Sequence, residues 1–335
     1  MGVDLFEKRL LIVTGKGGVG KSVVAASLAH LASRRGKNVL LVEMDTEDRL
    51  GDLFETERIG DRIAPVRDNV SGIDLSPRTV LEDFFRSHVR IKAVYGPILD
   101  SRLFNYFFEA APALRELVCL GKVYRLVEDR SWWTSRPKWD LVVFDAPATG
   151  HGVGLLNVPE SASHILLGGL KTSALKIRDL FRDPTQTAIS IVTLPEEMPV
   201  NEAELLHREL RGHGMPVTHL FLNQAFPERL TDQEASELET LDPAELGPAA
   251  QAAFGDARAQ AGLRDAVRFE RERAAMTAHY RTQIQARIDL PVIEIPFIFT
   301  ERFGLGEMER VATIIEDGLA PRRRPASAPS QEVSA

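Results

Sequence analysis

Residues 10–22 read LLIVTGKGGVGKS, and this stretch decides the fold. A short apolar run leads into a glycine-rich turn, and residues 15–22 match the pattern G-x-x-x-x-G-K-[ST]. The residues after the turn have the apolar spacing of a helix that ends at Gly36. The sequence therefore predicts a strand, a phosphate-binding loop and a helix, in that order.

Each part of this loop has a physical task. The glycines let the backbone wrap closely around phosphate with its N–H groups pointing inward, and the helix N-terminus adds the positive end of its dipole. Lys21 is expected to reach the β and γ phosphates, and Ser22 is expected to ligate Mg²⁺. The predicted nucleotide contacts in the loop are Gly15, Lys16, Gly17, Gly18, Val19, Gly20, Lys21 and Ser22.

Short apolar runs recur along the chain, and most of them are followed by a helical or turn pattern. Runs of this kind suit strands that are buried on both faces, and their alternation with helices is typical of a parallel sheet. We therefore predict an α/β P-loop NTPase fold, with a mostly parallel central sheet flanked by helices. The predicted strands are residues 10–14, 38–43, 140–145, 188–194, 217–223 and 291–297.

Two stretches interrupt this alternation with helix-like sequence, at about residues 77–131 and 228–287. The second is rich in Ala, Glu, Gln and Arg, which are good helix formers. We expect the two to form one helical subdomain inserted into a single P-loop domain over residues 1–320. Residues 321–335 combine Pro, Ala and Ser with an Arg triplet, and this composition predicts a disordered tail.

Composition limits the classes of function. The 335 residues carry a formal net charge of -7, with 44% hydrophobic and 27% charged residues, the profile of a globular protein with a large core. The acidic balance gives no global field for nucleic acid, so nucleic acid is not expected as a partner. Cys119 is the one cysteine in the sequence, so we expect neither a disulfide nor a four-thiolate zinc site. We expect the protein to be located in the reducing environment of the cytoplasm. We expect neither export nor a membrane span, because the sequence has no secretory signal and no run of about 18 apolar residues.

Lys16 is a residue that a plain phosphate loop does not require. The form KGGVGK at residues 16–21 resembles the deviant Walker A loop of the ATPase family that includes ArsA, the targeting factor for tail-anchored membrane proteins, MinD, ParA and the nitrogenase iron protein. The resemblance implies a dimer in which Lys16 of one subunit touches the nucleotide held by the other. A cation delivered in this way would stabilise charge on the transferring phosphoryl group, so we expect Lys16 to be catalytic.

A catalytic carboxylate is expected after the second predicted strand. That strand ends in VEMD at residues 42–45, where the resemblance places an aspartate, Asp45, that orients the attacking water. The chain continues DTEDRLGDLF where the ArsA branch reads Asp-Pro-Ala-His, although Leu50, Asp52 and Phe54 match that branch. Asp45 is therefore our catalytic candidate, and a turn or N-cap aspartate is the alternative.

A second carboxylate is expected to hold the metal ion. The predicted strand at residues 140–145 ends in Asp145, a Walker B pattern in which the carboxylate holds Mg²⁺ through its water shell. Ser22 and Asp145 form the predicted metal site. Residues 149–159 keep the spacing of the second switch in ArsA and the tail-anchor factor, so the chain resembles that branch more than MinD or ParA. We assign no proton transfer to His151.

Further residues are expected around the purine base. Asn223 lies in the run LFLNQAF, and the resemblance implies that it reads the adenine edge, for which an amide offers a donor and an acceptor side by side. A turn asparagine is the alternative interpretation. Pro296 and Phe297 begin a loop that, by the same resemblance, closes over the base.

The resemblance implies a Mg²⁺-dependent ATPase that works as a nucleotide-gated dimer, either a homodimer or a heterodimer with a related ATPase. Residues 77–131 are rich in Phe, Leu and Tyr, so they form either core or a groove for an apolar client helix. One cysteine does not supply the thiolates that bind arsenite, which leaves an apolar-helix client or a membrane receptor as the output we consider. Two alternatives stay open: a MinD/ParA-like positioning ATPase, and a non-hydrolysing ATP-binding subunit of a heteromeric complex.

Overall fold

The computed structural model describes most of the chain. The described residues are 4–44, 49–88, 101–102, 106, 108, 110–131, 135–147, 152–165, 168–242 and 247–320. Asp45, residues 149–151 of the second switch motif and the tail at residues 321–335 lie outside these ranges. Within them, no helix combines the length and the apolar character needed to cross a lipid bilayer.

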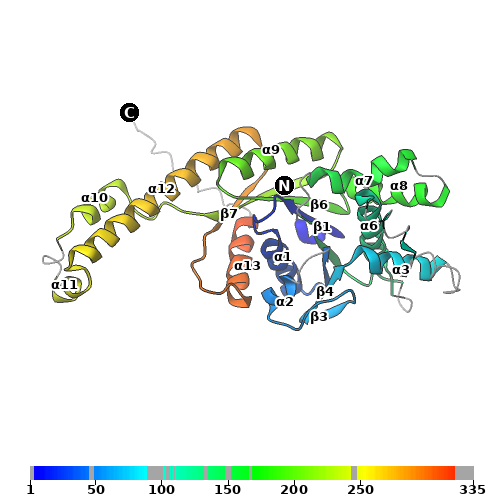
Figure 1. Ribbon diagram of the computed structural model, residues 1–335, viewed down its shortest axis with the longest axis horizontal. Helices are drawn as coiled ribbons and strands as arrows, with labels where there is room; N and C mark the ends of the chain where they lie inside the picture. The colour runs from blue at the N-terminus through cyan, green and yellow to red at the C-terminus, as the bar shows by residue number, and fades with distance from the viewer. Residues whose placement is uncertain are drawn as a thin grey trace, which may run out of the picture.

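An eight-stranded sheet forms the centre of the molecule (Figure 1). Its order is β3-β4-β2-β5-β1-β6-β7-β8, and each neighbouring pair is parallel except β3 with β4. The predicted fold class is confirmed. The strands are β1 (Leu10–Gly15), β2 (Val39–Met44), β3 (Ala64–Arg67), β4 (Val70–Leu75), β5 (Leu141–Asp145), β6 (Thr187–Thr193), β7 (Val217–Ala225) and β8 (Val292–Pro296).

Alternate residues of the central strands face two separate cores. In β1, Leu11 and Val13 belong to the core beneath the first helix of the chain, whereas Leu10 and Ile12 belong to the core on the opposite face. Every residue of β1 and β2 is buried. A strand that is covered on both faces has to be apolar throughout, which is why LLIVT is a continuous apolar run in the sequence.

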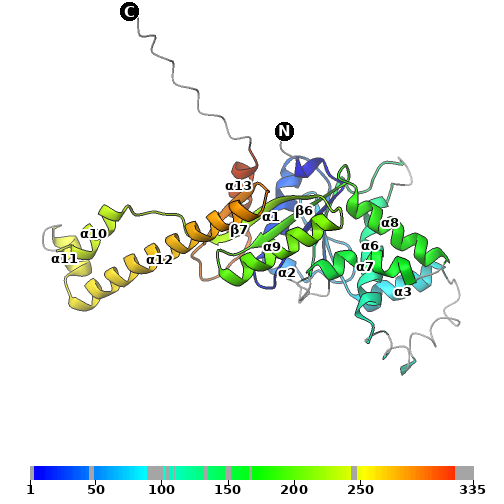
Figure 2. The ribbon, with the colours of Figure 1, turned by 90° about the horizontal axis from the view of Figure 1, so that it is seen from above.

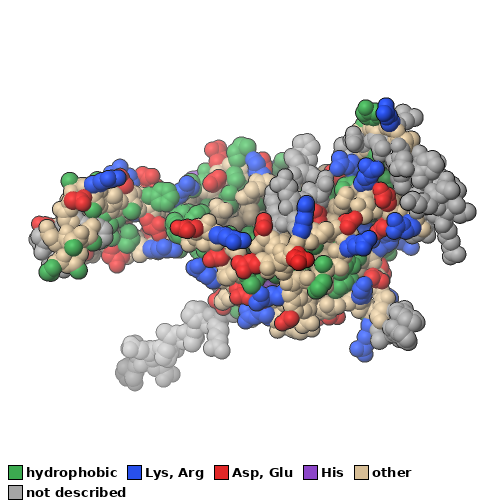
Figure 3. Space-filling view, turned by 60° about the horizontal axis from the view of Figure 1, so that its bottom comes forward, with side chains coloured by type: hydrophobic (Ala, Val, Ile, Leu, Met, Phe, Trp, Pro, Cys, Tyr) green, Lys and Arg blue, Asp and Glu red, His purple; other side chains and the backbone are tan. Residues whose placement is uncertain are grey.

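Helices cover both faces of the sheet. Side chains of α1, α2 and α13 complete one core, and side chains of α6, α7, α8 and α9 complete the other. On the face shown in Figure 3, Lys and Arg side chains are interspersed with Asp and Glu. The helices are α1 (Lys21–Arg34), α2 (Arg49–Phe54), α3 (Pro77–His88), α6 (Pro112–Glu128), α7 (Gly152–Ile165), α8 (Gly168–Arg182), α9 (Glu197–Gly212), α10 (Asp232–Thr240), α11 (Pro248–Phe254), α12 (Ala257–Arg287) and α13 (Leu305–Leu319).

The two helix-like stretches of the sequence lie at opposite ends of the molecule. α10, α11 and the outer part of α12 form an arm that extends from one end, whereas α3 and α6 lie with α7 and α8 at the other (Figures 1 and 2). We expected residues 77–131 and 228–287 to form one helical subdomain, but the structure separates them. The reason is connectivity: α3 follows β4 near one edge of the strand order, and α12 leads into β8 at the other edge.

Candidate nucleotide site

The phosphate loop lies at the carboxyl end of β1, where the strand order changes direction. β1 lies between β5 and β6, and the strands that follow it in sequence are distributed on both of its sides. In an open parallel sheet, a crevice at such a point is the usual ligand site. The register pairs Val13 of β1 with Asp145 of β5, so the loop and this carboxylate leave the sheet side by side.

Two glycines of the loop occupy positions that reject a side chain. Gly20 is the N-cap of α1 with a left-handed φ of 90°, and a Cβ added there would overlap the amide nitrogen of Asn223. Gly15 has a φ of 150°, and a Cβ there would overlap the carbonyl oxygen of Val192 in β6. The loop therefore fits closely between the ends of β6 and β7.

Lys21 lies over the loop that it follows. It begins α1, its side chain is buried, and its Nζ donates a hydrogen bond to the carbonyl oxygen of Lys16 at 2.9 Å. Gly17 and Gly18 at the tip of the loop are exposed, whereas Val19 is buried. An ammonium held to the backbone of a loop with exposed glycines is an arrangement that suits an incoming phosphate.

Ser22 and Asp145, the predicted metal ligands, are in direct contact. The Ser22 hydroxyl donates to Asp145 Oδ2 at 2.5 Å, and the Asp145 side chain is almost fully buried at the end of β5. Both side chains offer oxygen, the ligand type that Mg²⁺ prefers in proteins. Their chemistry and their position beside the phosphate loop therefore fit a magnesium ion.

Lys16 makes a contact that the sequence did not predict. Its Nζ lies 2.7 Å from Glu202 Oε1, and the two side chains are 34% and 43% exposed. Glu202 lies on α9, which follows β6, the neighbour of β1. Nothing in the run LPEEMPVNE distinguishes this glutamate from the others in it, so only the fold identifies Glu202 as the partner of Lys16.

Asn223 meets the phosphate loop from β7. Its Nδ2 donates to the carbonyl oxygen of Val19 at 2.8 Å, and its side chain is buried. The β7–β8 register shifts between Leu222 and Ala225, and Gln224 adopts a left-handed φ of 54°. A bulge of this kind redirects the neighbouring side chain, and here it accompanies an asparagine that is turned towards the loop.

Pro296 and Phe297 lie beside this bulge, at the end of β8. The Phe297 N–H donates to the carbonyl oxygen of Ala225 at 2.9 Å. Its ring stacks on Phe226, with 5.2 Å between the ring centroids. Phe269 and Phe299 meet Phe226 edge-on, so the four rings form an aromatic cluster where the arm joins the sheet.

A histidine is buried in the same strand as Asn223. Burial lowers the pKa of His219 from 6.5 to about 4, because the imidazolium would lose its hydration there. His219 is paired in register with Ser190 of β6, which is also buried. His219 is therefore neutral at physiological pH, and we assign it to the interior of the sheet rather than to the nucleotide site.

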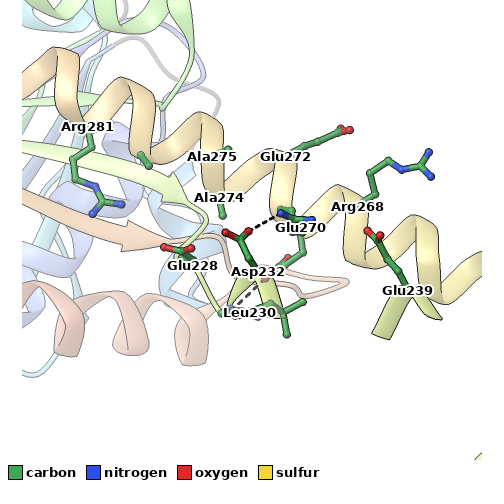
Figure 4. Close-up of a pocket in the computed structure, with 13 residues that line it drawn as sticks. Glu228, Leu230, Asp232, Glu239, Arg268, Glu270, Glu272, Ala274, Ala275 and Arg281 are labelled. Carbon is green, nitrogen blue, oxygen red and sulfur yellow. Dashed lines mark hydrogen bonds and ion pairs between the residues drawn. The ribbon is translucent and has the colours of Figure 1, made fainter. Parts of the chain in front are cut away.

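A separate hollow of about 400 Å³ lies on the arm between α10 and α12 (Figure 4). Its charged side chains include the ion pair of Arg271 with Asp232 at 2.7 Å and that of Arg229 with Glu270 at 3.5 Å. None of its lining residues belongs to the predicted nucleotide site. Small side chains of α12 also line it, namely Ala274, Ala275 and Ala278.

Comparison with known proteins points to a family of ATPases. The model of the family described as anion-transporting ATPase matches residues 8–174 and 167–242, which include the phosphate loop, Asp145, Glu202 and Asn223. ATPase GET3C of Arabidopsis thaliana is 26% identical over 279 residues, which cover 69% of this chain and 70% of that protein.

Two bacterial relatives are similar over a comparable part of this chain. ATPase BagA of Mycobacterium tuberculosis is 29% identical over 240 residues, which cover 68% of each protein. An arsenical pump-driving ATPase of Acidiphilium multivorum is 25% identical over 244 residues, which cover 67% of this chain but 41% of that protein.

Proposed function

The chain belongs to the anion-transporting ATPase family and is an ATPase. From this premise we propose that it is a Mg²⁺-dependent molecular switch in which ATP binding causes two chains to pair and hydrolysis releases them. The observation that carries the proposal is the contact between Ser22 and Asp145 beside the phosphate loop. It joins the two predicted metal ligands at the point where the β and γ phosphates of ATP would lie.

Side chains of one chain would bind the triphosphate. The backbone N–H groups of the loop and the ammonium of Lys21 would hold the β and γ phosphates. Ser22 and Asp145 would hold Mg²⁺, which neutralises negative charge on those phosphates. Asn223, fixed to the loop through the Val19 carbonyl, would present the rest of its amide to the adenine edge.

Hydrolysis would need two further residues. Asp45 follows Met44 at the carboxyl end of β2, and its carboxylate would orient the water that attacks the γ phosphate. Lys16 of the second chain would stabilise the charge that develops during phosphoryl transfer. Because Lys16 would act in the site of the other chain, turnover would depend on pairing.

The helices that respond to ATP and contact a client would be α3, α6, α7 and α8. α7 begins at Gly152, within the second switch motif of residues 149–159, so a change at the γ phosphate would reach this group along the chain. Cys119, Leu120 and Val123 of α6 are fully buried, so the inner face of α6 is core. Leu170 of α8 is 50% exposed, and we propose that outer apolar side chains of this group contact an apolar helix of a client.

We do not propose arsenite transport as a function of this chain. One relative is named an arsenical pump-driving ATPase, but that name applies to that protein. A soft metalloid needs several thiolates, and the one cysteine of this sequence, Cys119, is buried on the inner face of α6.

The experiment is a comparison of wild type with Asp45→Asn. Wild type should hydrolyse ATP with Mg²⁺ and should sediment as a larger species with ATP than without it. Asp45→Asn should bind ATP and stay in the larger species, with turnover reduced at least about 100-fold because the water is no longer oriented. Equal turnover in the two proteins would contradict the role of Asp45, and one sedimenting species with and without ATP would contradict the gated pairing.

A further inference from the structure

The ion pair of Lys16 with Glu202 conflicts with the role proposed for Lys16. Both side chains belong to the same chain, and the ammonium lies 2.7 Å from the carboxylate. A lysine that acts in the site of a second chain has to leave this carboxylate first. The contact therefore holds Lys16 in a position from which it does not act on a neighbouring nucleotide.

Glu202 belongs to an exposed face of α9. Met198 and Leu205 lie four residues before it and three residues after it, a spacing that places all three on one side of a helix. Met198 is 62% exposed and Leu205 is 48% exposed, whereas Val200 and Ala203 on the other side of α9 are buried. We call Met198, Glu202 and Leu205 the outer face of α9.

A second copy of the chain fits this outer face. A second copy that brings its triphosphate towards Lys16 has to approach the outer face of α9, because Glu202 and Lys16 are in contact. Two apolar side chains would then be covered, which favours association. The ion pair of Lys16 with Glu202 opposes this association, because Lys16 must leave the Glu202 carboxylate. The free energy cost is small, since an exposed ion pair of this kind stabilises a protein only slightly.

We propose that Glu202 is a latch that holds Lys16 within its own chain, and that docking of a second copy on the outer face of α9 releases it. The inference rests on the proposed function, in which Lys16 acts on the nucleotide of the second chain. Glu202 is a positioning residue in this account, because it acts through Lys16 and touches no reacting atom. The latch would oppose pairing, so a higher protein concentration would be needed for ATP turnover.

The test is the dependence of ATP turnover on protein concentration for Glu202→Gln. This variant removes the negative charge and keeps the shape of the side chain. Half-maximal turnover per chain should be reached at a protein concentration about 2- to 5-fold lower than in wild type, the size expected for loss of a half-exposed ion pair. Turnover at saturating protein should be unchanged, and a role of Glu202 in folding alone would not produce this split.

A matched control is Glu237→Gln. Glu237 is an exposed glutamate on α10 in the arm, so the variant makes the same charge change away from Lys16 and away from the outer face of α9 (Figure 1). It should leave the concentration dependence as in wild type. Leu205→Ser should move half-maximal turnover to higher protein concentration, because it removes apolar surface from the outer face of α9.

Three results would contradict the latch, and each of them would overturn a different step of the proposal. A higher half-maximal concentration for Glu202→Gln would mean that Glu202 supports pairing instead of opposing it. A curve for Glu202→Gln identical to that of Glu237→Gln would mean that the ion pair has no effect on pairing. Turnover per chain that is independent of wild-type concentration, together with full activity of Lys16→Ala, would instead remove the paired mechanism on which the latch rests.

Discussion

The hydroxyl of Ser22 donates a hydrogen bond to the carboxylate of Asp145 at 2.5 Å, although 123 positions separate the two residues in the chain. The contact exists because β1 and β5 are neighbours in the sheet, with Val13 opposite Asp145. The predicted phosphate loop thus comes to lie beside a buried carboxylate.

Loss of the buried carboxylate should weaken the response to magnesium. In Asp145→Asn the amide is a poorer ligand for a hard cation, so the Mg²⁺ concentration for half-maximal ATP turnover should rise about 10- to 100-fold. The measurement is turnover as a function of Mg²⁺ at fixed ATP. Asp61→Asn, a change at an exposed aspartate, is the control and should follow the wild-type curve. An unchanged midpoint in Asp145→Asn would remove this residue from the metal site.

Gly20 should tolerate alanine less well than Gly18. Both have a left-handed φ, so alanine strains the backbone at each, by about 1 kcal/mol. The Gly18 position is open, whereas a Cβ on Gly20 would overlap the Asn223 amide, and overpacking of this kind costs about 1–3 kcal/mol more. Urea unfolding of Gly18→Ala and Gly20→Ala should show the difference.

A double-mutant cycle identifies the source of that difference. Asn223→Ala removes the amide that a Gly20 side chain would meet. The free energy cost of Gly20→Ala should therefore be smaller in the Asn223→Ala background than in wild type. An equal cost in the two backgrounds would show that Asn223 does not fill the space beside Gly20.

His219 should make the protein less stable in acid. Burial lowers its pKa from 6.5 to about 4, so the unfolded chain takes up a proton at a pH where the folded chain does not. The contribution of His219 to the free energy of unfolding is fully present above 6.5, the pKa of a histidine in the unfolded chain. This contribution is lost as the pH falls towards the folded pKa of about 4. Between about pH 7.5 and about pH 5 the loss should be about 2 kcal/mol of unfolding free energy.

The measurement for His219 is urea unfolding at both pH values in wild type and His219→Leu. The variant has no titrating group at this position, so its unfolding free energy should fall by about 2 kcal/mol less than that of wild type over the same interval. Parallel losses in the two proteins would assign the acid sensitivity to other groups.

The aromatic cluster should depend on Phe226 far more than on Phe299. Phe226 is buried, and its ring contacts those of Phe297, Phe269 and Phe299, whereas the Phe299 ring is 62% exposed. Phe226→Ala should lower the free energy of unfolding by about 3–5 kcal/mol, and Phe299→Ala by less than about 1 kcal/mol. Similar losses from the two substitutions would mean that the cluster is not organised around Phe226.

Much of the fold could be predicted from the sequence because the central strands are buried on both faces. The runs at β1, β2, β5 and β6 are mostly apolar, and this pattern predicts strands. β3 was not predicted, because Val66 is the one buried residue of this short edge strand. The separation of the two helical groups was also missed, since periodicity predicts a helix but not the sheet edge at which it lies.

The candidate site was predictable where a motif fixes a residue to a strand end. Ser22, Asp145 and Asn223 each lie at or near the carboxyl end of a strand, so a parallel sheet brings them to one edge. Glu202 lies within a helix among several other glutamates, and its proximity to Lys16 depends on how α9 packs beside β1. Such a contact has no signature in the sequence.

The most direct test of the account is complementation between two inactive chains. Lys16→Ala keeps Asp45, and Asp45→Asn keeps Lys16, so each variant alone should be inactive. In a mixed pair, the Lys16→Ala chain has its own Asp45 and receives Lys16 from the other chain, which restores one of the two sites. Equal mixing should therefore recover about a quarter of wild-type turnover per chain, because about half of the pairs are mixed. No recovery, in a mixture in which mixed pairs are shown to form, would contradict the claim that Lys16 acts on the nucleotide of the other chain.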